Sequence, residues 1–186
     1  WTSEKPYVIY GLAIIDEGCS LDIMEGTNVY LHKNSSIMAY KDGILRVNGQ
    51  QGNPVTFQGD RLEPFYHNVP GQWGGIWFFN ESKNNKIDHA IIKNGTIGIE
   101  ADNNDGINPN VTITNTQVYQ MSGLCIIGYN AIIKAENSVF ANGGQYCGAF
   151  VLGGDYDFRH CTFADYYQYG NRQTPTIIMT NYWDSL

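Results

Sequence analysis

The sequence predicts an all-β fold, a single-stranded right-handed parallel β-helix over residues 1–186 with about seven coils and three short strands in each coil. Segments in which apolar and polar residues alternate recur at intervals of 21 to 26 residues, and a period in this range is typical of solenoids. The 21 glycines punctuate these segments as turn residues. No stretch shows the apolar spacing and capping residues of an amphipathic helix.

The second half of the chain carries the clearest repeat. Each repeat alternates apolar and polar residues and ends in Asn or His, at His89, Asn115, Asn137, His160 and Asn181. The apolar residues three places after the first four are Ile92, Val118, Phe140 and Phe163. About 22 residues accommodate three short strands, each pairing with the coils above and below at about 4.8 Å. We expect the Asn and His side chains to form a structural ladder that hydrogen-bonds the turn backbone and its own members.

The first half repeats more loosely. Leu21-x-Ile23 returns 24 residues later as Leu45-x-Val47, which places the two segments in one column on neighbouring coils. The remaining alternating segments are Val29-x-Leu31, residues 37–40, Val55-x-Phe57 and residues 76–78. The stretch from Gly59 to Gln72 does not alternate, so we expect it to leave the stack as a surface loop.

The register gives two expectations about side chains. Cys125 and Cys147 fall in one inward column on adjacent coils. They should remain free thiols, because parallel stacking holds their Cβ atoms wider apart than the ~3.8 Å of a relaxed disulfide. Glu136 and Arg159 fall in one outward column, one coil apart, and should form a surface ion pair.

Composition excludes several classes of function. The formal net charge of −7 and the lack of a Lys/Arg cluster exclude a nucleic-acid partner, since that binding draws its affinity from clustered cations. No apolar run approaches the 18 or more residues of a membrane span, so we expect no direct membrane insertion of this segment. The four cysteines show no CxxC spacing, and no motif indicates a cofactor.

Two stretches resemble a known family. LDIMEGTNVYLHKNSSIMAYKDGILRVNGQQGNPVTFQGDR, followed by PGQWGGIWF, is similar to the right-handed β-helix region of cell-surface lipoproteins from Bacteroidetes-type bacteria, and NGTIGIEAD, FRHCTFADYY and TNYW continue the likeness. The resemblance implies a pectin-lyase-like fold with no established activity. It also implies an extracytoplasmic location, on the outer-membrane-anchored cell surface or in the periplasm, with polysaccharide or other cell-envelope domains as partners.

The repeat also bears on the extent of the protein. The segment from Ile177 to Asn181 opens a coil that the five remaining residues cannot complete. A stack that stops without a cap leaves unpaired backbone groups and an open apolar cross-section. We therefore predict that the chain is a fragment of a longer surface protein.

Catalytic residues are not evident in the repeat. Hydrolysis of a glycosidic bond needs two carboxyl groups a few ångströms apart, and the column before the Asn/His ladder has no adjacent acidic pair. Asp155 and Asp157 lie on one side of a strand, and we interpret them as solvated surface. We therefore expect no catalytic residue and no carboxyl pair in a groove. Residues 102–108 are rich in Asp and Asn but lack EF-hand spacing, so we expect a polar turn and no metal.

Aromatic side chains remain as binding candidates. Flat rings with a polar edge suit the apolar faces of sugars, and the candidate glycan platform consists of Tyr66, Tyr166, Tyr167, Tyr169 and Trp183. The leading hypothesis is a non-catalytic structural or recognition module of a cell-envelope protein, with a glycan as its candidate ligand. The alternative is a carbohydrate-active enzyme of the pectin-lyase-like superfamily, either a polysaccharide lyase or a glycoside hydrolase. A groove lined by carboxylates would favour the enzyme.

Overall fold

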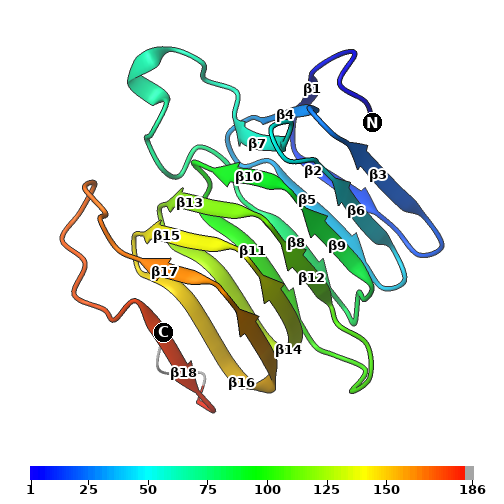
Figure 1. Ribbon diagram of the computed structural model, residues 1–186, viewed down its shortest axis with the longest axis vertical. Helices are drawn as coiled ribbons and strands as arrows, with labels where there is room; N and C mark the ends of the chain where they lie inside the picture. The colour runs from blue at the N-terminus through cyan, green and yellow to red at the C-terminus, as the bar shows by residue number, and fades with distance from the viewer. Residues whose placement is uncertain (183–186) are drawn as a thin grey trace.

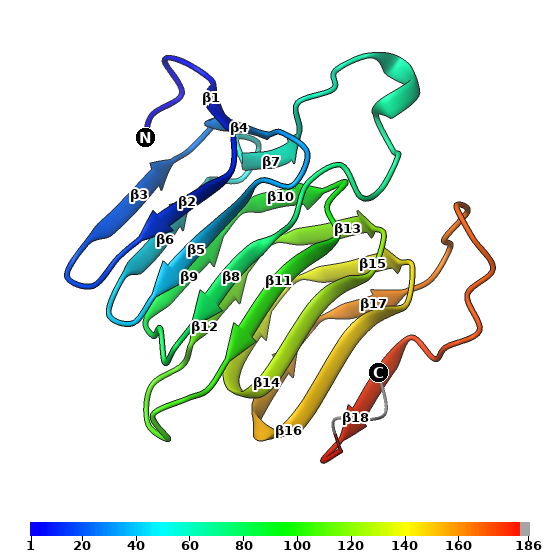
Figure 2. The same cartoon turned by 180° about the vertical axis from the view of Figure 1, so that it is seen from behind.

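The alternating segments fold as short β-strands that wind into a parallel solenoid. The computed structural model describes residues 1–182 and shows about seven coils, as the sequence predicts; each of the first six has three strands or strand segments, and the last has β17 and β18. Every strand pairs in parallel with the strand one coil before or after it. Figures 1 and 2 show the coils stacked along one axis, with β1 and β18 at opposite ends of the stack. Apart from one 3-10 turn, η1 (Pro64–Tyr66), the described residues contain no helix.

The strands form three faces. The first face contains β1 (Tyr7–Ile9), β4 (Asn28–Leu31), β7 (Val55–Gly59), β10 (Ala90–Lys93), β13 (Gln117–Met121), β15 (Val139–Gly143) and β17 (Thr162–Ala164). The second contains β2 (Leu12–Ile15), β5 (Ser36–Tyr40), β8 (Ile76–Phe79), β11 (Ile97–Asp102), the first parts of β14 (Leu124–Glu136) and β16 (Tyr146–Arg159), and β18 (Ile177–Thr180). The third contains β3 (Ser20–Met24), β6 (Ile44–Asn48), β9 (Asn85–Asp88), β12 (Val111–Thr114) and the second parts of β14 and β16.

The core lies inside the coil and is built from the inward half of each alternation. In β6, Leu45 and Val47 are fully buried while Arg46 between them points outward. The predicted columns are confirmed, since Leu21 pairs with Leu45, Ile92 with Val118, and Phe140 with Phe163. A side chain withdrawn from water in this way contributes about 1.5–3 kcal/mol. Because each inward residue stacks on its counterparts in the neighbouring coils, the core is continuous along the axis.

The corner between the third and first faces requires a left-handed backbone. His89, Asn115, Asn137 and His160 have φ between 49° and 52°, a region that Asn, Asp and His tolerate better than most residues. The backbone N–H groups of His89, Asn115 and Asn137 each donate to a carbonyl of the next coil, for example Asn137 to Arg159 at 3.1 Å. The column itself is therefore confirmed for these four residues, and its cause is the backbone conformation.

The side chains of that column do not form the expected ladder. Asn115 and His89 both contact Asp88 Oδ1, at 3.0 and 2.8 Å, but within residues 1–182 the side chains of Asn137 and His160 make no hydrogen bond. Stacked hydrogen bonds occur one position later. The hydroxyl of Ser138 accepts from the N–H of Thr116 at 3.2 Å, and the hydroxyl of Thr116 accepts from the N–H of Ala90 at 3.2 Å. At this position short buried hydroxyls connect the coils.

The expected position of Asn181 in this column is wrong. Its strand, β18, stacks on the first part of β16, where Ile177 pairs with Gly148 and Thr180 pairs with Val151. Asn181 therefore follows a strand of the second face and does not reach the corner occupied by His160. Residues 165–176 form a long loop after β17, and the chain rejoins the stack on the second face instead of the third. Both faces use the same alternation, so the pattern of residues 177–181 alone could not distinguish them.

The loop from Gly59 to Gln72 leaves the stack, as predicted, and carries η1 (Figure 1). Two side chains hold the loop against the solenoid by hydrogen bonds. Gln72 Nε2 donates to the carbonyls of Tyr66 and Val69 at 2.7 Å each, and Asn94 Nδ2 donates to the carbonyl of Val69 at 3.0 Å. A Cβ on Gly59 would lie 2.4 Å from Gln72 Oε1, so only glycine leaves room for this side chain.

The two stacked cysteines are free thiols and fully buried, as predicted. Their neighbours pair as Leu124 with Tyr146 and Ile126 with Gly148, which sets Cys125 beside Cys147. Arg172, from the 165–176 loop, covers them. Its Nη1 lies 3.6 Å from Cys147 Sγ, and its Nη2 pairs with Asp165 at 2.8 Å. The cysteine pair thus has a buried cation at its edge.

Candidate functional site

The outer surface of the second face is unusually apolar. Its outward residues form two columns parallel to the solenoid axis. The first column runs Ile14, Met38, Trp77, Glu100, Ile127, Ala149 and Ile178. The second runs Tyr40, Phe79, Asp102, Tyr129, Val151 and Thr180. In these columns Glu100 and Asp102 are the residues that carry charge.

We call the central part of this surface the outer aromatic face, defined by Tyr40, Trp77, Phe79, Glu100, Asp102 and Tyr129. The rings of Trp77 and Phe79 stack with their centroids 5.7 Å apart and their planes within 6°. Further along the axis, Leu124, Ile127, Tyr146 and Ala149 form a second apolar cluster, separate from the solenoid core. The four residues of this second cluster are buried, so on that side of the acidic residues the part-exposed ring of the outer aromatic face is that of Tyr129.

A hollow of about 290 Å³ lies over the two carboxyl groups. It is lined by Phe79, Glu100, Asp102, Asn103, Tyr129, Asn130 and Leu152. Phe79 comes from the coil before Glu100 and Tyr129 from the coil after it, so the hollow has an aromatic ring on each side along the axis. The amides of Asn103 and Asn130 add groups that both donate and accept hydrogen bonds.

Glu100 and Asp102 point outward from the same strand, β11, because Ile99 and Ala101 beside them are buried in the core. They are two positions apart on the strand, which places their Cα atoms about 6.6 Å apart. Asp102 is held in place, since its Oδ1 accepts the backbone N–H of Asn80 at 2.8 Å. Burial raises the pKa of Asp102, and the hydrogen bond from Asn80 opposes that rise.

The environment of Glu100 favours its protonated form. Its neighbours in the column are Trp77 and Ile127, which offer no charge. Burial raises the pKa of Glu100 to about 7, and the nearby charge of Asp102 contributes to the rise. Burial thus raises the pKa of both carboxyl groups, and perturbed pKa values of this kind cluster at functional sites.

Glu100 and Asp102 thus line the same hollow, on a face where the repeat did not lead us to expect two carboxyl groups. The acidic residues considered from the repeat lie on different coils, in the column before the Asn/His corner. Glu100 and Asp102 belong to one strand on a different face. The available signal was two acidic residues two places apart in an otherwise apolar strand, with aromatic residues in the segments one coil before and after.

The candidate glycan platform does not come together as one surface. Tyr66 lines a separate hollow of about 480 Å³ beneath the Gly59–Gln72 loop, where the guanidinium of Arg61 lies 4.3 Å from its ring centroid. Tyr166 is 78% exposed, and the rings of Tyr167 and Tyr169 meet edge to face at 6.1 Å. These three residues belong to the 165–176 loop, near the other end of the stack (Figure 1). Trp183 lies outside the described residues.

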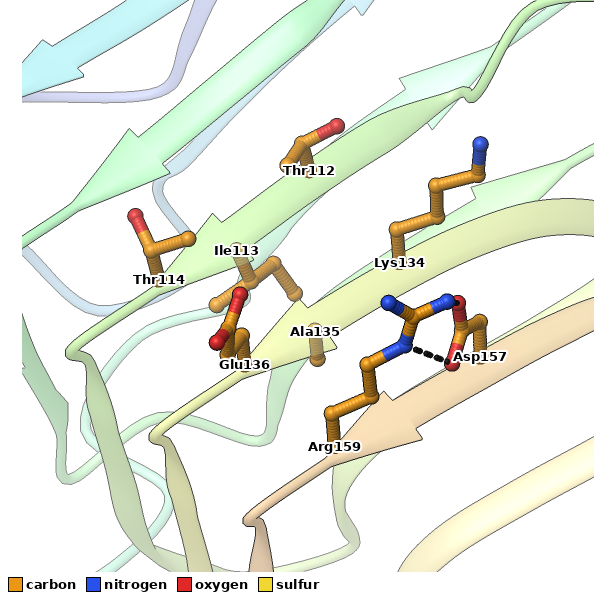
Figure 3. A pocket seen from close by; sticks show the side chains of 8 residues that line it. All are labelled: Thr112, Ile113, Thr114, Lys134, Ala135, Glu136, Asp157 and Arg159. Carbon is orange, nitrogen blue, oxygen red and sulfur yellow. Dashed lines mark hydrogen bonds and ion pairs between the residues drawn. The ribbon is translucent and has the colours of Figure 1, made fainter.

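A third hollow, of about 270 Å³, lies on the outer surface of the third face and is lined by charged residues (Figure 3). Glu136 and Arg159 share an outward column there, as predicted. The prediction of an ion pair between Glu136 and Arg159 is wrong. Arg159 Nη2 pairs instead with Asp157 Oδ2, at 2.7 Å. Asp157 lies two places away on the same strand, and Figure 3 shows Glu136 turned away from Arg159. No aromatic ring lines this hollow.

The polar turn at residues 102–108 is organised by Asp105. Its Oδ1 accepts the backbone N–H groups of Ile107 and Asn108 at 2.9 and 2.8 Å, and these bonds hold the pKa of Asp105 well below its usual value. Among residues 1–182 no group of three or more His, Cys, Asp or Glu side chains is arranged to hold a metal ion. The same residues include no helix with the length and apolarity needed to cross a membrane.

No protein-family model, curated protein or solved structure matches the chain. The case for a function therefore depends on the geometry of the outer aromatic face.

Proposed function

We propose that this chain is a carbohydrate-recognition module that binds a neutral polysaccharide along the outer aromatic face. The observation that carries the proposal is the line of outward rings on successive coils, interrupted by two carboxyl groups over one hollow. Rings suit the apolar faces of sugars, while carboxylates and amides accept and donate hydrogen bonds at sugar hydroxyls. Because the surface runs along the axis, it suits an extended chain of sugars better than a compact ligand.

The charge of the site favours a neutral ligand. Glu100 and Asp102 line the hollow, and no Lys or Arg does. The formal net charge of the chain is −7. A polysaccharide with carboxylate or sulfate groups would therefore be repelled at this surface.

We further infer that the chain belongs to a bacterial cell-envelope protein. This inference is supported by the resemblance of residues 21–61 and 70–78 to the β-helix region of Bacteroidetes-type surface lipoproteins with a pectin-lyase-like fold. Its partners would then be polysaccharide and neighbouring envelope domains. Antibody labelling of intact bacteria tests the location, and labelling only after the cells are lysed would contradict it.

Calorimetric titration tests the binding. We expect the chain to bind at least one of the neutral polysaccharides β-glucan, xylan and galactomannan, and to bind polygalacturonate more weakly. Phe79→Ala should weaken binding at least about tenfold, because the stacking of a ligand ring on one aromatic side chain contributes on the order of 1–3 kcal/mol to the binding free energy.

Tyr166→Ala is the matched control. Tyr166 is an exposed ring on the 165–176 loop, away from the hollow, so its removal should leave the affinity unchanged. A loss of binding in Tyr166→Ala with none in Phe79→Ala would move the site to the loops. Failure of all three neutral polysaccharides to bind would overturn the proposal.

A further inference from the structure

We propose that the hollow beneath the Gly59–Gln72 loop binds a small phosphate monoester, with Arg61 and Lys33 as the groups that hold the phosphate. This site is separate from the outer aromatic face and does not depend on the function proposed for that face. The hollow has a volume of about 480 Å³, within the usual range for small-molecule sites. It is lined by residues 32–33, at the turn after β4, and by parts of residues 60–72.

The walls of the hollow are held in place by hydrogen bonds. The turn after β4 is closed by the backbone N–H of Ser35, which donates to the carbonyl of His32 at 3.0 Å. The loop begins at Asp60, whose backbone N–H donates to the carbonyl of Leu31 at 3.1 Å. At its far end Gln72 Nε2 donates to two carbonyls of the loop, each at 2.7 Å. The backbone around the hollow is thus fixed before a ligand arrives, which lowers the entropic cost of binding.

The guanidinium of Arg61 is oriented by an aromatic ring. Its Cζ lies 4.3 Å from the ring centroid of Tyr66, a cation–π contact. Stacking on a ring leaves the N–H groups at the edge of a guanidinium available to a ligand. Within residues 1–182 Arg61 forms no ion pair with a carboxylate. An arginine edge of this kind can bind two oxygens of one phosphate.

The other charges of the lining also favour an anion. Lys33, like Arg61, has no carboxylate partner in the described part of the chain. The lining contains one carboxylate among these residues, Asp60, and its Oδ2 lies 2.7 Å from Nδ1 of His32. With His32 counted as neutral, the lining carries a net positive charge although the formal net charge of the chain is −7.

Two cations without carboxylate partners suit a phosphate monoester better than a carboxylate. A phosphate monoester carries about −1.5 to −2 charges near neutral pH and has three terminal oxygens. A carboxylate has a single charge and two oxygens. Arg61 would bind two of the phosphate oxygens and Lys33 the third. Val69 and Pro70 also line the hollow and offer apolar contacts to the organic part of the ester.

Calorimetric titration of wild type with phenyl phosphate, benzoate and inorganic phosphate tests the ligand class. Phenyl phosphate should bind, and benzoate should bind at least about tenfold more weakly because it lacks the second charge and the third oxygen. Inorganic phosphate should also bind more weakly than phenyl phosphate, since it has no organic part to contact Val69 and Pro70. Added salt should weaken the binding, because Lys33 and Arg61 are exposed.

Substitutions test the two cations. Arg61→Gln and Lys33→Gln should each weaken the binding of phenyl phosphate at least about tenfold, because each removes a charged hydrogen-bond donor. Arg61→Lys should recover only part of the loss, since a point charge replaces the planar guanidinium. Arg46→Gln is the matched control, because Arg46 lies on β6 and pairs with Asp22 at 3.4 Å. Phe79→Ala alters the outer aromatic face instead, and both controls should bind phenyl phosphate as wild type does.

The proposal has defined ways to fail. Equal affinity of wild type for phenyl phosphate and benzoate would reject the phosphate assignment, and this comparison holds whether or not a variant folds. No binding of phenyl phosphate at millimolar concentrations, or unchanged affinity in both Arg61→Gln and Lys33→Gln, would overturn the site. Full recovery in Arg61→Lys would reject the role of the stacked guanidinium. A loss in Phe79→Ala would move the ester to the outer aromatic face and overturn the proposal for this hollow.

Discussion

At the scale of single residues, two acidic side chains on this solenoid have opposite environments. Burial alone would raise the pKa of Asp88. Hydrogen bonds from Thr114 and Asn115 and the contact with Lys86 outweigh it, so the pKa falls to about 2. Glu100 has burial without comparable donors, and its pKa rises to about 7. Asp88 is thus a fixed charge that joins two coils, whereas Glu100 can exchange a proton near neutral pH.

Glu100 should lower the free energy of unfolding at high pH. Its pKa is about 7 in the folded chain against 4.5 for the unperturbed group, so the folded state binds more protons between these values. Stability from this site is therefore present below about pH 4.5 and is lost as the pH rises through 7. Glu100→Gln should be more stable than wild type by about 1–2 kcal/mol at pH 8, allowing for partial exposure, and equal to it near pH 4. Urea titrations at both pH values measure the difference, and a gain that is independent of pH would contradict this account.

The thiols of Cys147 and Cys125 should lose their protons at different pH values. A hydrogen bond from Cys125 and the guanidinium of Arg172 lower the pKa of Cys147, whereas burial raises the pKa of Cys125. Arg172→Gln should raise the pKa of Cys147, and Arg172→Lys should raise it less because a cation remains. Ultraviolet absorbance of the thiolate follows the titration. Cys147→Ser provides the control, since it should abolish the step assigned to Cys147.

At the scale of structural elements, the corner column depends on the left-handed backbone. Asn137 has φ of 50°, where a β-branched residue is strained by about 1–2 kcal/mol. Asn137→Val should therefore lower the free energy of unfolding by that amount, and Asn137→Gly should lower it less. Lys134→Val, on an outward strand position of the same coil, serves as the control. Similar losses in both valine variants would show that the corner conformation is not the cause.

A strand could be predicted from the sequence wherever its outward residues are polar and its inward residues apolar. Leu45 and Val47 alternate with Arg46, so both the strand and its inward face follow from the sequence. The position of β18 could not be predicted in this way. Residues 177–180 alternate equally well for two faces, and the length of the 165–176 loop decided which face they joined.

At the scale of the whole molecule, the winding of the solenoid brings strands that are far apart in the sequence together in one surface. Phe79, Asp102 and Tyr129 are 23 and 27 residues apart in the sequence and become neighbours only when the register is known. The sequence also conceals this surface because Ile126 and Ile127 face opposite sides and are both apolar. Alternation disappears where both sides of a strand are apolar. This is why the candidate site was missed although the fold was predicted.

The length of the surface should determine which ligands bind tightly. Tyr40, Phe79, Asp102 and Tyr129 occupy four successive coils, a span of about 14 Å at 4.8 Å per coil. Affinity for neutral oligosaccharides should therefore rise with chain length until the ligand covers these coils, and then level off, because further sugars meet no additional ring of this group.

Tyr40→Ala tests that span, since Tyr40 lies at one end of it and two coils from Asp102. The variant should lose affinity for long oligosaccharides. It should keep wild-type affinity for oligosaccharides that occupy the hollow over Asp102 and are too short to reach Tyr40. Calorimetry on a length series of the polysaccharide that binds best measures both effects. Equal affinity for the shortest and longest members, or an equal loss in Tyr40→Ala at every length, would mean that the ligand occupies the hollow alone and does not extend along the coils.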